Sequence, residues 1–510
     1  MTPTDAGSAP RPAGNRPLQL AELSDLLGTP VAAGGPADPA IRGVTLASDE
    51  VRPGDLYAAL PGARTHGARY AADAAGRGAV AVLTDPAGAE VAAGTGLPVL
   101  LADRPRALLG ALAAAVYGDP TAGMLVIGVT GTNGKTTTAY LLEEGLRAAG
   151  HTTGLIGTVA TMVAGESVPS TRTTPEATDL QATFAVMRER GVNAVAMEVS
   201  SHALALGRVD ATRFDVGAFT NLSQDHLDFH GGMEDYFAAK AMLFDGRCAH
   251  EVVTIDDLWG RRLVKPDTVT VSALGDPAAT WRAVDPVTAP TGSTQFRVLG
   301  PDVDLRAGIR LPGAFNVANG LLAVATLATA GVPALTAVRG IAARDVPGRM
   351  EKVNLGQGYV AVVDYAHTPD AVERLLDALR PTTAGRLILV LGAGGDRDRE
   401  KRPLMGAAGA AGADVLIVTD DNPRSEDPAA IRSAVLAGAL GVRDRGEVVE
   451  IGDRRAAVVE AVRRARPGDA VVVAGKGHEQ GQEVDGVVHP FDDRVVLREA
   501  LEELSGSVGR

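Results

Sequence analysis

The strongest constraint on the fold is the regular alternation of short apolar runs and helical patterns over residues 348–510. The apolar runs are rich in Val, Leu and Ile, which is typical of strands that are buried on both faces. Such alternation predicts a parallel sheet with helices on both faces. The expected strands are 359–364, 386–391, 414–419, 447–451 and 470–474, and the expected helices are 370–380, 428–440 and 454–466.

Polar segments follow four of these expected strands. They are Asp-Tyr-Ala-His at 364–367, Gly-Ala-Gly-Gly-Asp-Arg-Asp at 392–398, Asp-Asp-Asn-Pro-Arg at 420–424 and Gly-Lys-Gly-His-Glu at 475–479. Parallel strands that belong to one sheet end at the same edge, and ligands bind outside that edge. Residues with a purely structural role would be scattered over both edges. The pattern therefore predicts a ligand site on one rim of this sheet.

A glycine-rich loop connects another buried strand, at 124–130, to a helix expected at 137–149. Its backbone N–H groups and the helix N-terminus can hold phosphate oxygens, while the lysine neutralises phosphate charge and the hydroxyl after it can hold Mg²⁺. Val129 stands where the common form of this motif has glycine. Strand, Gly-Lys-Thr and helix together still predict nucleotide binding. The loop residues are Gly131, Thr132, Asn133, Gly134, Lys135, Thr136 and Thr137.

Two further strand ends in the same block carry candidate metal ligands. Glu198 follows the expected strand 194–197, and His226 lies shortly after the expected strand 216–220. A carboxylate suits the preference of Mg²⁺ for hard oxygen ligands, and His226 is a candidate ligand for a second metal site. Either residue alone would more commonly be a cap or a packing residue, so the hypothesis depends on their occurring together.

Lysine is rare: the chain has 43 arginines and six lysines. Where lysine persists, its ammonium or amine chemistry can be the reason, although chance retention is the alternative. Lys135, Lys240 and Lys476 lie within motifs. Lys240 has two interpretations: a surface lysine that packs its alkyl stem on apolar neighbours, or a desolvated amine that takes up CO₂ as a carbamate and offers oxygen ligands to Mg²⁺.

Composition excludes several other classes of protein. At ~150 residues per domain, 510 residues suggest about three domains. A formal charge of −13 argues against a nucleic-acid-binding protein, and the single cysteine excludes disulfides and cysteine-ligated zinc. Residues 1–17 lack the apolar segment of a secretion signal, and we expect a disordered tail there. The apolar stretch 107–117 is too short to span a membrane. Because a chain with one cysteine suits a reducing compartment, we expect a cytoplasmic protein.

Over nearly its whole length, the sequence resembles the Mur ligases of bacterial peptidoglycan precursor synthesis. The motifs that carry the resemblance are GTNGKTT (131–137), EVSSH (198–202), TNLSQDHLDFHG (220–231), YFAAK (236–240), LPGAFNVANG (311–320), VPGRME (346–351), VDYAHTPDA (363–371), GAGGDRD (392–398) and GKGHE (475–479). In the diaminopimelate-specific members, DNPR is present, and it is matched here at 421–424.

The resemblance implies an α/β protein of three domains. After the tail come a Rossmann-like UDP-substrate-binding domain at 18–123, a central ATP-binding phosphate-loop domain with a mostly parallel sheet at 124–347, and a Rossmann-like amino-acid-binding domain at 348–510. It also implies ATP and Mg²⁺, and an N6-carboxylated Lys240. Lys135, Glu198, His226 and Lys240 are then the catalytic residues, and Thr136, Glu198, His226 and the Lys240 carbamate the metal ligands.

By the same resemblance, further residues receive binding roles. Asn319, Arg349 and Asp364 would contact ATP, in addition to the phosphate loop. The UDP-muramoyl dipeptide would contact Leu46, Ser48, Thr173, Thr174, Ser200 and Arg208, and diaminopimelate would contact Arg397, Asp421, Asn422, Pro423, Arg424, Gly475 and Glu479. Two positions depart from the family: Leu206 replaces a glutamine found in some members, and 63–65 lacks a histidine.

The implied reaction is formation of an amide. The D-glutamyl γ-carboxylate of UDP-N-acetylmuramoyl-L-alanyl-D-glutamate would attack ATP to give an acyl phosphate, which the amine of diaminopimelate then attacks. Arg424 would select diaminopimelate, because a guanidinium pairs with its distal carboxylate and repels the ammonium that lysine carries there. We expect a monomer that binds these small molecules and no nucleic acid.

Four alternative functions remain at this point. A lysine-adding member of the family is disfavoured by Arg424, and folylpolyglutamate synthase is not expected to have the N-terminal domain or DNPR. A non-catalytic nucleotide-binding scaffold would not need Lys135, Glu198, His226 and Lys240 together. A phosphate-loop motor or kinase would leave both terminal domains unexplained.

Overall fold

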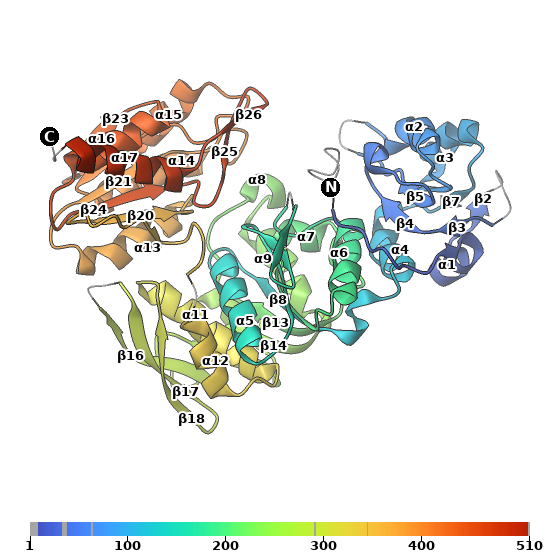
Figure 1. Ribbon diagram of the computed structural model, residues 1–510, viewed down its shortest axis with the longest axis horizontal. Helices are drawn as coiled ribbons and strands as arrows, with labels where there is room; N and C mark the ends of the chain where they lie inside the picture. Colours follow the sequence, from blue (N-terminus) through green and yellow to red (C-terminus); the bar gives the residue numbers. More distant parts are fainter. Residues whose placement is uncertain are drawn as a thin grey trace. The chain divides into compact units, whose positions relative to one another are not determined.

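The computed structural model describes residues 9–32, 38–62, 65–170, 172–289, 292–343 and 345–507. Positions 63 and 64, where the sequence departs from the family, lie outside these ranges, as do residues 1–8 of the expected tail. The chain divides into two compact units, whose elements are labelled in Figure 1. The first contains Met1–Thr130, Ala149–Ala218 and Ala239–Glu251, and the second contains Gly131–Ala148, Phe219–Ala238 and Val252–Arg510.

The N-terminal sheet of the first unit has five strands in the order β2-β7-β6-β5-β4. Strands β4 (Gly43–Thr45), β5 (Asp55–Ala58), β6 (Ala81–Thr84) and β7 (Val99–Leu101) are parallel, and β2 (Val31–Ala32) is an antiparallel edge. Parallel strands need crossover connections, which is why helices separate them in the chain. This sheet confirms the expected N-terminal α/β domain.

Alternation along these strands builds a core on each face of the sheet. Leu56 and Leu83 belong to one buried cluster, which includes residues of α1 (Leu20–Leu27) and α4 (Leu109–Val116). Tyr57 follows Leu56, and Val82 precedes Leu83. Both belong to a second buried cluster, which includes residues of α2 (Ala71–Gly76). Successive side chains of a strand point to opposite faces, so both faces are covered, as the parallel pattern predicts.

Part of the segment expected to be disordered makes specific contacts in the first unit. Arg11 Nη1 donates to Asp55 Oδ1 at 3.0 Å, and Asn15 Nδ2 donates to the carbonyl oxygen of Arg42 at 2.6 Å. The backbone N–H of Gly14 donates to Glu189 Oε1 at 2.7 Å. Because Asp55 is buried, its carboxylate requires a cation or donors, and Arg11 supplies both. The expectation of disorder therefore does not extend to Arg11–Asn15.

The longest apolar stretch noted in the sequence, 107–117, contains helix α4, which has only eight residues. Six of those residues are buried, so the helix lies within the protein core. In the part of the chain that the structure describes, we find no helix with the length and apolar character that crossing a membrane requires.

The strand that precedes the phosphate loop belongs to a parallel group in the first unit. Strand β12 (Ala194–Glu198) pairs in parallel with β8 (Leu125–Thr130) on one side and with β9 (Thr153–Ile156) on the other. Strands β10 (Thr161–Val163) and β11 (Glu166–Val168) then continue from β9 in antiparallel pairing. The parallel pairing places the carboxyl ends of β8 and β12 at the same edge.

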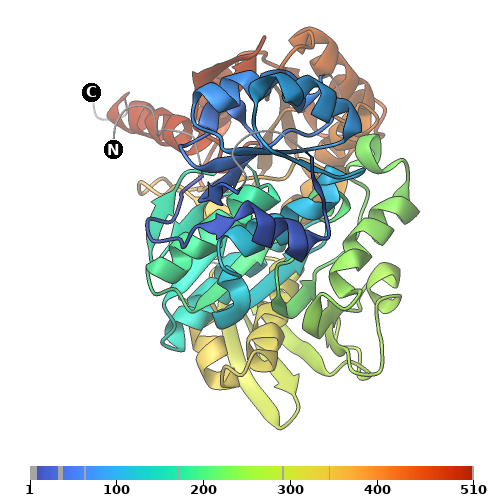
Figure 2. The same ribbon diagram turned by 90° about the vertical axis from the view of Figure 1, so that its right-hand side faces the viewer.

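In the second unit, the phosphate-loop helix α5 (Lys135–Ala148) packs against α11 (Ala314–Thr329) and α12 (Ala334–Ile341). Strands β16 (Trp281–Thr288), β17 (Thr294–Gly300) and β18 (Val303–Ile309) form an antiparallel meander. Figures 1 and 2 show α11 and α12, in yellow, lying against these yellow-green strands. A Cβ added at Gly340 would overlap the backbone of Gly145, so close packing of these two glycines fixes α12 on α5.

The C-terminal sheet, also in the second unit, has the order β19-β20-β24-β21-β22-β23. Strands β20 (Val360–Asp364), β24 (Ala470–Ala474), β21 (Leu387–Leu391), β22 (Val415–Val418) and β23 (Glu447–Glu450) are parallel. Helices α13 (Pro369–Leu379), α15 (Pro428–Leu440) and α16 (Arg454–Arg464) lie where the sequence predicts them. The strand pattern and the parallel sheet are confirmed.

The sequence did not anticipate three elements of this domain. They are the antiparallel edge strand β19 (Glu351–Lys352), the hairpin of β25 (Gly481–Val484) and β26 (Val487–Pro490), and the helix α17 (Asp493–Ser507). Valines of α17 and α16 cover one face of the sheet together. The hairpin contacts the rim that is described below.

Candidate active site

Two glycines with positive φ shape the phosphate loop of the second unit. Gly131 has φ +139° and Gly134 has φ +91°, conformations that residues with a Cβ rarely adopt. A Cβ on Gly131 would overlap Thr220 Oγ1, and one on Gly134 would overlap Asn319 Oδ1. The loop therefore requires glycine at both positions for conformation and for space. This arrangement brings Asn319, one of the predicted ATP-contacting residues, beside the loop.

The segment after β13 (Phe214–Phe219) holds the loop in shape. Thr220 Oγ1 and Asn221 Nδ2 both donate to the carbonyl oxygen of Asn133, at 2.7 Å and 3.0 Å. Asn221 Oδ1 accepts from the backbone N–H of Asn133 at 3.1 Å, and the backbone N–H of Ser223 donates to Thr132 Oγ1 at 3.1 Å. Sequence reasoning gave Thr220, Asn221 and Ser223 no role, although they lie within the matched motif TNLSQDHLDFHG.

Lys135 and Thr136 lie at the start of α5, where the helix N-terminus favours anions. Lys135 Nζ donates to the carbonyl oxygens of Gly131 and Thr132, each at 2.9 Å, so its ammonium lies over the loop. Arg349 Nη2 donates to Thr136 Oγ1 at 2.9 Å. Arg349 is therefore a second cation at the phosphate loop, in addition to Lys135. Thr137, the last predicted residue, is buried in α5.

Arg349 also connects the loop to the beginning of the C-terminal domain. Its guanidinium lies 4.3 Å from the ring centroid of Tyr365, a distance at which a cation and an aromatic face attract each other. Asp364 accepts hydrogen bonds from the backbone N–H groups of Met350, at 2.7 Å, and Ala366, at 2.8 Å. Burial raises the pKa of Asp364, although Arg349 and these donors oppose that effect. The structure therefore groups Thr136, Arg349 and Asp364.

His226, the candidate metal ligand, caps helix α8 (Leu227–His230) in a left-handed conformation with φ +53°. Its Nε2 lies 3.3 Å from Asp225 Oδ2. Burial raises the pKa of Asp225, but nearby cations, His226 first and Lys401 and Lys135 among the others, outweigh burial and lower this pKa to about 2. Asp225 is therefore an anion at neutral pH, in a position to orient the imidazole of His226.

In the first unit, Glu198 and the predicted substrate residues form one hydrogen-bonded group. Glu198 is buried at the end of β12, and its carboxylate accepts from the backbone N–H of Thr158 at 2.8 Å and from Thr158 Oγ1 at 3.1 Å. Thr158 Oγ1 also lies 2.9 Å from Thr173 Oγ1. Thr158 thus joins Glu198 to Thr173, although no motif indicated it.

Thr174 and Ser200 continue this group. Thr174 Oγ1 donates to the carbonyl oxygen of Glu198 at 2.9 Å, and the backbone N–H of Ser200 donates to Thr174 Oγ1 at 3.1 Å. Arg208 Nη1 donates to the carbonyl oxygen of Thr174 at 3.4 Å, and Arg208 Nη2 pairs with Glu176 at 2.9 Å. Four of the predicted substrate residues therefore lie together. Glu176, which also pairs with Arg106, is a partner that sequence reasoning missed.

The remaining predicted residues of the first unit are Lys240, Ser48 and Leu46. Lys240 is 1 % exposed in helix α9 (Met233–Ala241), so its interpretation as a surface lysine is wrong. Ser48 begins the short helix η1 (Ser48–Glu50), and Leu46 packs against the N-terminal core. In the described residues, no three side chains of His, Cys, Asp or Glu gather as a metal-binding group.

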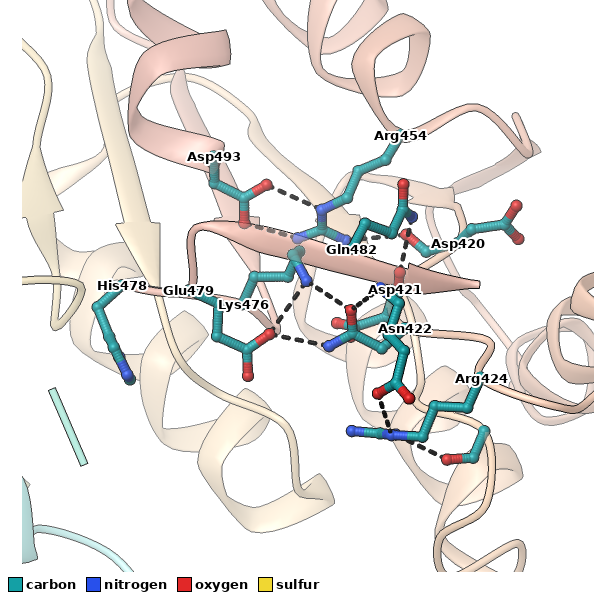
Figure 3. A network of polar contacts seen from close by, with 12 residues as sticks. Asp420, Asp421, Asn422, Arg424, Arg454, Lys476, His478, Glu479, Gln482 and Asp493 are labelled. Carbon is teal, nitrogen blue, oxygen red and sulfur yellow. Dashed lines mark hydrogen bonds and ion pairs between the residues drawn. The ribbon is translucent and has the colours of Figure 1, made fainter. Parts of the chain in front are cut away.

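The C-terminal rim consists of 364–367, 392–398, 420–424 and 475–479, which all follow the carboxyl ends of parallel strands. Arg424 lies on this rim in a left-handed conformation, φ +54°, and its side chain is 21 % exposed. Its Nη1 donates to the carbonyl oxygen of Gly395 at 2.7 Å, and its Nε lies 3.2 Å from Glu483 Oε2 (Figure 3). The guanidinium is thus fixed between two rim segments and the hairpin.

Most other predicted amino-acid-binding residues lie beside Arg424 on the rim. Asn422 Nδ2 donates to Glu479 Oε2 at 2.9 Å (Figure 3). A Cβ on Gly475 would approach Asp421 Oδ2 to 2.5 Å, so these two segments are in close contact. Pro423 is buried. Arg397 differs from the others because its side chain is exposed, with Nη1 bonded to the carbonyl oxygen of Asp396.

Two buried cations beneath the rim had no predicted role. Lys476 is 0 % exposed and donates to Asn422 Oδ1 at 2.9 Å and to Glu479 Oε2 at 3.0 Å. Arg454 pairs with Asp493 at 2.7 Å, with both side chains fully buried, and its Nη2 donates to the carbonyl oxygen of Ala474 at 3.0 Å. Burial lowers the pKa of Arg454, but Asp493 outweighs this and holds it above its usual value. The sequence signals for Lys476 were the rarity of lysine and its place in the motif GKGHE, whereas Arg454 had none.

The fold and the site define an α/β enzyme class in which a phosphate loop is combined with a Rossmann-like domain whose strand ends carry a rim of polar side chains. Family models match three segments of the chain: "Mur ligase family, catalytic domain" at 40–117, "Mur ligase middle domain" at 129–327 and "Mur ligase, glutamate ligase domain" at 348–477. The chain belongs to the Mur ligase family. The resemblance seen in the sequence is confirmed.

Curated relatives match the chain along nearly its full length. It is 58% identical to UDP-N-acetylmuramoyl-L-alanyl-D-glutamate–2,6-diaminopimelate ligase of Streptomyces avermitilis, covering 98% of this chain and 99% of that one. Identity to the ligase of the same name from Corynebacterium glutamicum is 51%, covering 95% and 97%. A solved structure of a ligase with this name has a TM-score of 0.64 and 32% identity, and covers 91% of this chain and 96% of that one.

Proposed function

We propose that the protein is an ATP-dependent ligase that joins diaminopimelate to the D-glutamyl γ-carboxylate of UDP-N-acetylmuramoyl-L-alanyl-D-glutamate. The observation that carries this function is the position of Arg424, a largely buried guanidinium on a rim beside Asn422 and Glu479. Identity of 58% to a ligase named for these substrates supports the same assignment. A lysine-adding enzyme would leave this guanidinium without a distal carboxylate to bind.

The reaction first requires neutralisation of charge, because the attacking carboxylate and the γ-phosphate of ATP are both anions. Lys135 and Arg349 are the two cations at the phosphate loop, and they reduce this repulsion and stabilise charge on the phosphoryl group in transfer. Attack of the carboxylate oxygen on phosphorus breaks the bond to ADP and gives an acyl phosphate. The amine then attacks the acyl carbon, and inorganic phosphate leaves with the bonding electron pair.

Binding of ATP is assigned to the loop residues 131–137 together with Asn319, Arg349 and Asp364. The backbone N–H groups of the loop bind phosphate oxygens, and Asn319 lies against Gly134. Asp364 is held by two backbone donors and is a candidate acceptor for a sugar hydroxyl. The mechanism uses positioning and electrostatics and needs no covalent enzyme intermediate.

Mg²⁺ suits the donors that the chain offers, because they are hard oxygens and an imidazole. Thr136, Glu198, His226 and a carbamylated Lys240 are the residues that would hold it, and the ion would supply positive charge to phosphate oxygens. Glu198 fits this role, since its buried carboxylate is already oriented by Thr158. His226 fits because Asp225 can fix the imidazole.

The first unit supplies the contacts for the UDP-muramoyl dipeptide. Thr173, Thr174, Ser200 and Arg208 form the hydrogen-bonded group next to Glu198, and Ser48 and Leu46 are assigned to the uridine end. Burial lowers the pKa of the Arg208 guanidinium, and the Glu176 carboxylate opposes that effect. Arg208 is thus a cation held in place for an anionic substrate.

Mass spectrometry of the product tests the function. The full chain is incubated with ATP, Mg²⁺, UDP-N-acetylmuramoyl-L-alanyl-D-glutamate and an equimolar mixture of diaminopimelate, lysine and glutamate. We expect a product that contains diaminopimelate, with ADP and phosphate formed in equal amounts. A lysine-containing product would identify a lysine-adding enzyme. In a parallel incubation a folate acceptor replaces the nucleotide substrate, and turnover of glutamate there, with none on the nucleotide substrate, would overturn the proposal.

Carbamylation of Lys240 is a separate part of the proposal, and its support is burial. The Lys240 side chain is 1 % exposed, and the neutral amine is the form that attacks CO₂. The nitrogen lone pair forms a bond to carbon, a proton leaves, and the carbamate gains two oxygen atoms as ligands. A bound Mg²⁺ would stabilise this carbamate by pairing with its negative charge.

Substitution of Lys240 tests the carbamate. Lys240→Ala should abolish ligase activity, and millimolar short carboxylates such as acetate should restore part of it by replacing the carbamate oxygens. Lys265→Ala, which changes an exposed lysine, is the matched control and should leave activity unchanged. A carbamate signal in ¹³C NMR after exposure to labelled bicarbonate should appear in the native chain and disappear in Lys240→Ala. Full activity of Lys240→Ala without added carboxylate would contradict the assignment.

A further inference from the structure

We propose that Lys476 is a positioning residue that fixes Asn422 and Glu479 for the distal end of the amino-acid substrate. This inference rests on the proposed function. Lys476 follows β24 directly after Gly475, and its side chain is fully buried, so its ammonium lies behind the rim (Figure 3). Glu479, in contrast, has a side chain that is 32 % exposed. The lysine is therefore out of reach of the substrate, while its partner is accessible.

Three side chains close a triangle of hydrogen bonds at this point of the rim. Lys476 Nζ donates to Asn422 Oδ1 at 2.9 Å and to Glu479 Oε2 at 3.0 Å, and Asn422 Nδ2 donates to the same Glu479 oxygen at 2.9 Å. Each side chain is thus bound by the other two. A triangle of this kind determines both the Glu479 rotamer and the Asn422 rotamer, because either could move only by breaking two bonds.

The orientation of the Asn422 amide depends on Lys476. Asn422 Oδ1 accepts from Lys476 Nζ and from the backbone N–H of Glu483, at 3.0 Å. If the amide were turned over, its NH₂ group would face two donors, which cannot accept from it. Lys476 therefore keeps Nδ2 directed toward Glu479 Oε2. An apolar side chain at 476 would remove one of the two donors that enforce this orientation.

Charge gives a second reason for a lysine at this position. The Glu479 carboxylate needs a cation because it is partly removed from water, and in this setting a buried ammonium interacts more strongly than an exposed one. The neighbouring Arg454 guanidinium is committed to Asp493 at 2.7 Å. Lys476 is therefore the side-chain cation bonded to Glu479 in the described network, and it holds the Glu479 carboxylate in a fixed place.

The distal end of diaminopimelate carries both an ammonium and a carboxylate. A fixed Glu479 carboxylate complements the ammonium, and the Arg424 guanidinium complements the carboxylate. Both groups must be held at a set separation to bind such a zwitterion, and Lys476 holds one of them. Loss of Lys476 should therefore weaken binding of the amino acid, while the phosphate loop, which has no contact with this triangle, continues to bind ATP.

Lys476→Met in the full chain tests this role, because methionine has a similar length and no charge. We expect the KM for diaminopimelate to rise roughly 30-fold or more, as when one partner of a buried charged hydrogen bond is removed. The KM for ATP and for the nucleotide substrate should stay within about twofold, a split that general loss of stability would not give. Lys352→Met, at an exposed lysine of the same domain, is the control and should change none of these constants.

A double-mutant cycle with Glu479→Gln separates positioning from simple destabilisation. If Lys476 acts through Glu479, Lys476→Met should have a clearly smaller effect on the KM for diaminopimelate in the Glu479→Gln background than alone. Lys476→Gln, which keeps an N–H donor, replaces Lys476→Met if the methionine variant does not fold, and it should show the same coupling. Equal effects in both backgrounds, or an unchanged KM in a folded variant, would overturn the inference. Failure of the native chain to use diaminopimelate would instead overturn the proposed function.

Discussion

The phosphate loop and the C-terminal rim follow strand ends in the same way, but they are built from different parts of the chain. The loop presents backbone N–H groups, and two glycines with φ +139° and +91° give it its shape. The rim presents side chains, which come from four segments and are fixed by buried ions such as Lys476 and the Arg454–Asp493 pair. The loop therefore depends on conformation, and the rim depends on charge.

This difference explains how each region responds to change. A backbone site fails when the chain cannot adopt its φ and ψ angles, whatever the charge of the new side chain. A side-chain site fails when a partner is lost, because a buried ion or amide then has no hydrogen bond. Substitutions in the loop should therefore change the kinetics for ATP, and substitutions in the rim the kinetics for diaminopimelate. Only the effects at the rim should depend on pH and salt.

Among the changes that compare these two regions, Gly134→Ala in the phosphate loop should have the strongest effect. The added Cβ would strain a φ of +91° and overlap Asn319 Oδ1, so we expect kcat/KM for ATP to fall by about 10³. Gly150→Ala is the matched control: its φ is +90°, but nothing lies within 4 Å of the added Cβ. The control should lower thermal stability and leave ATP kinetics unchanged. Equal kinetic effects of the two substitutions would show that the loop does not depend on close packing.

The next effect is that of Arg424→Ala on the rim. Loss of a largely buried guanidinium should raise the KM for diaminopimelate about 10²-fold, because its distal carboxylate loses a charge-assisted partner. The KM for ATP should not change. Arg455→Ala, at an exposed arginine of α16, is the control. If Arg424→Ala left the KM for diaminopimelate unchanged, the assignment of the rim to this substrate would be wrong.

The pH dependence of the free energy of unfolding tests whether the imidazole of His367, on the rim, is buried in its neutral form. Burial, followed by the charge of Lys401, lowers the pKa of His367 to about 4. The unfolded chain binds this proton near pH 6.5, whereas the folded chain binds it only near pH 4, so folding is penalised as pH falls between these values. His367 alone should lower the free energy of unfolding by about 2 kcal/mol between pH 8 and pH 5.

Chemical unfolding of the native chain and of His367→Asn across this pH range measures that contribution. Asparagine can keep the hydrogen bond from the ring Nδ1 to the carbonyl oxygen of Tyr365, which is 2.9 Å long, but it does not titrate. The variant should therefore lose less stability toward pH 5 than the native chain. Parallel stability curves for the two chains would mean that His367 does not contribute.

The smallest expected effect is that of Glu483→Gln in the hairpin. Glu483 Oε2 lies 3.2 Å from Arg424 Nε, and its side chain is 39 % exposed, so it competes weakly with a substrate carboxylate for the guanidinium. Removing its charge should lower the KM for diaminopimelate by about two- to fivefold at low salt, and this gain should disappear at high salt. A higher KM would show instead that Glu483 assists the substrate.

Much of the fold and part of the site could be predicted from the sequence. The five parallel strands of the C-terminal sheet were predicted because apolar runs and helical periods are local patterns. The phosphate loop was predicted because its glycines and lysine are contiguous. The roles of Lys476, Thr158 and Glu176 could not be predicted, since a buried ion pair or a shared hydrogen bond depends on residues that are distant along the chain.

Local patterns in the sequence were enough to predict where strands alternate with helices, that a phosphate loop follows β8, and that Arg424 lies at a strand end. Which charges are buried, and which groups bond them, follows from the folded chain: the Lys240 side chain is buried, and Lys476 donates hydrogen bonds to Asn422 and Glu479. The two kinds of property differ in how far apart along the chain the residues that set them lie. Backbone conformation follows from neighbouring residues, whereas desolvation and hydrogen-bond geometry are set by atoms that folding brings together.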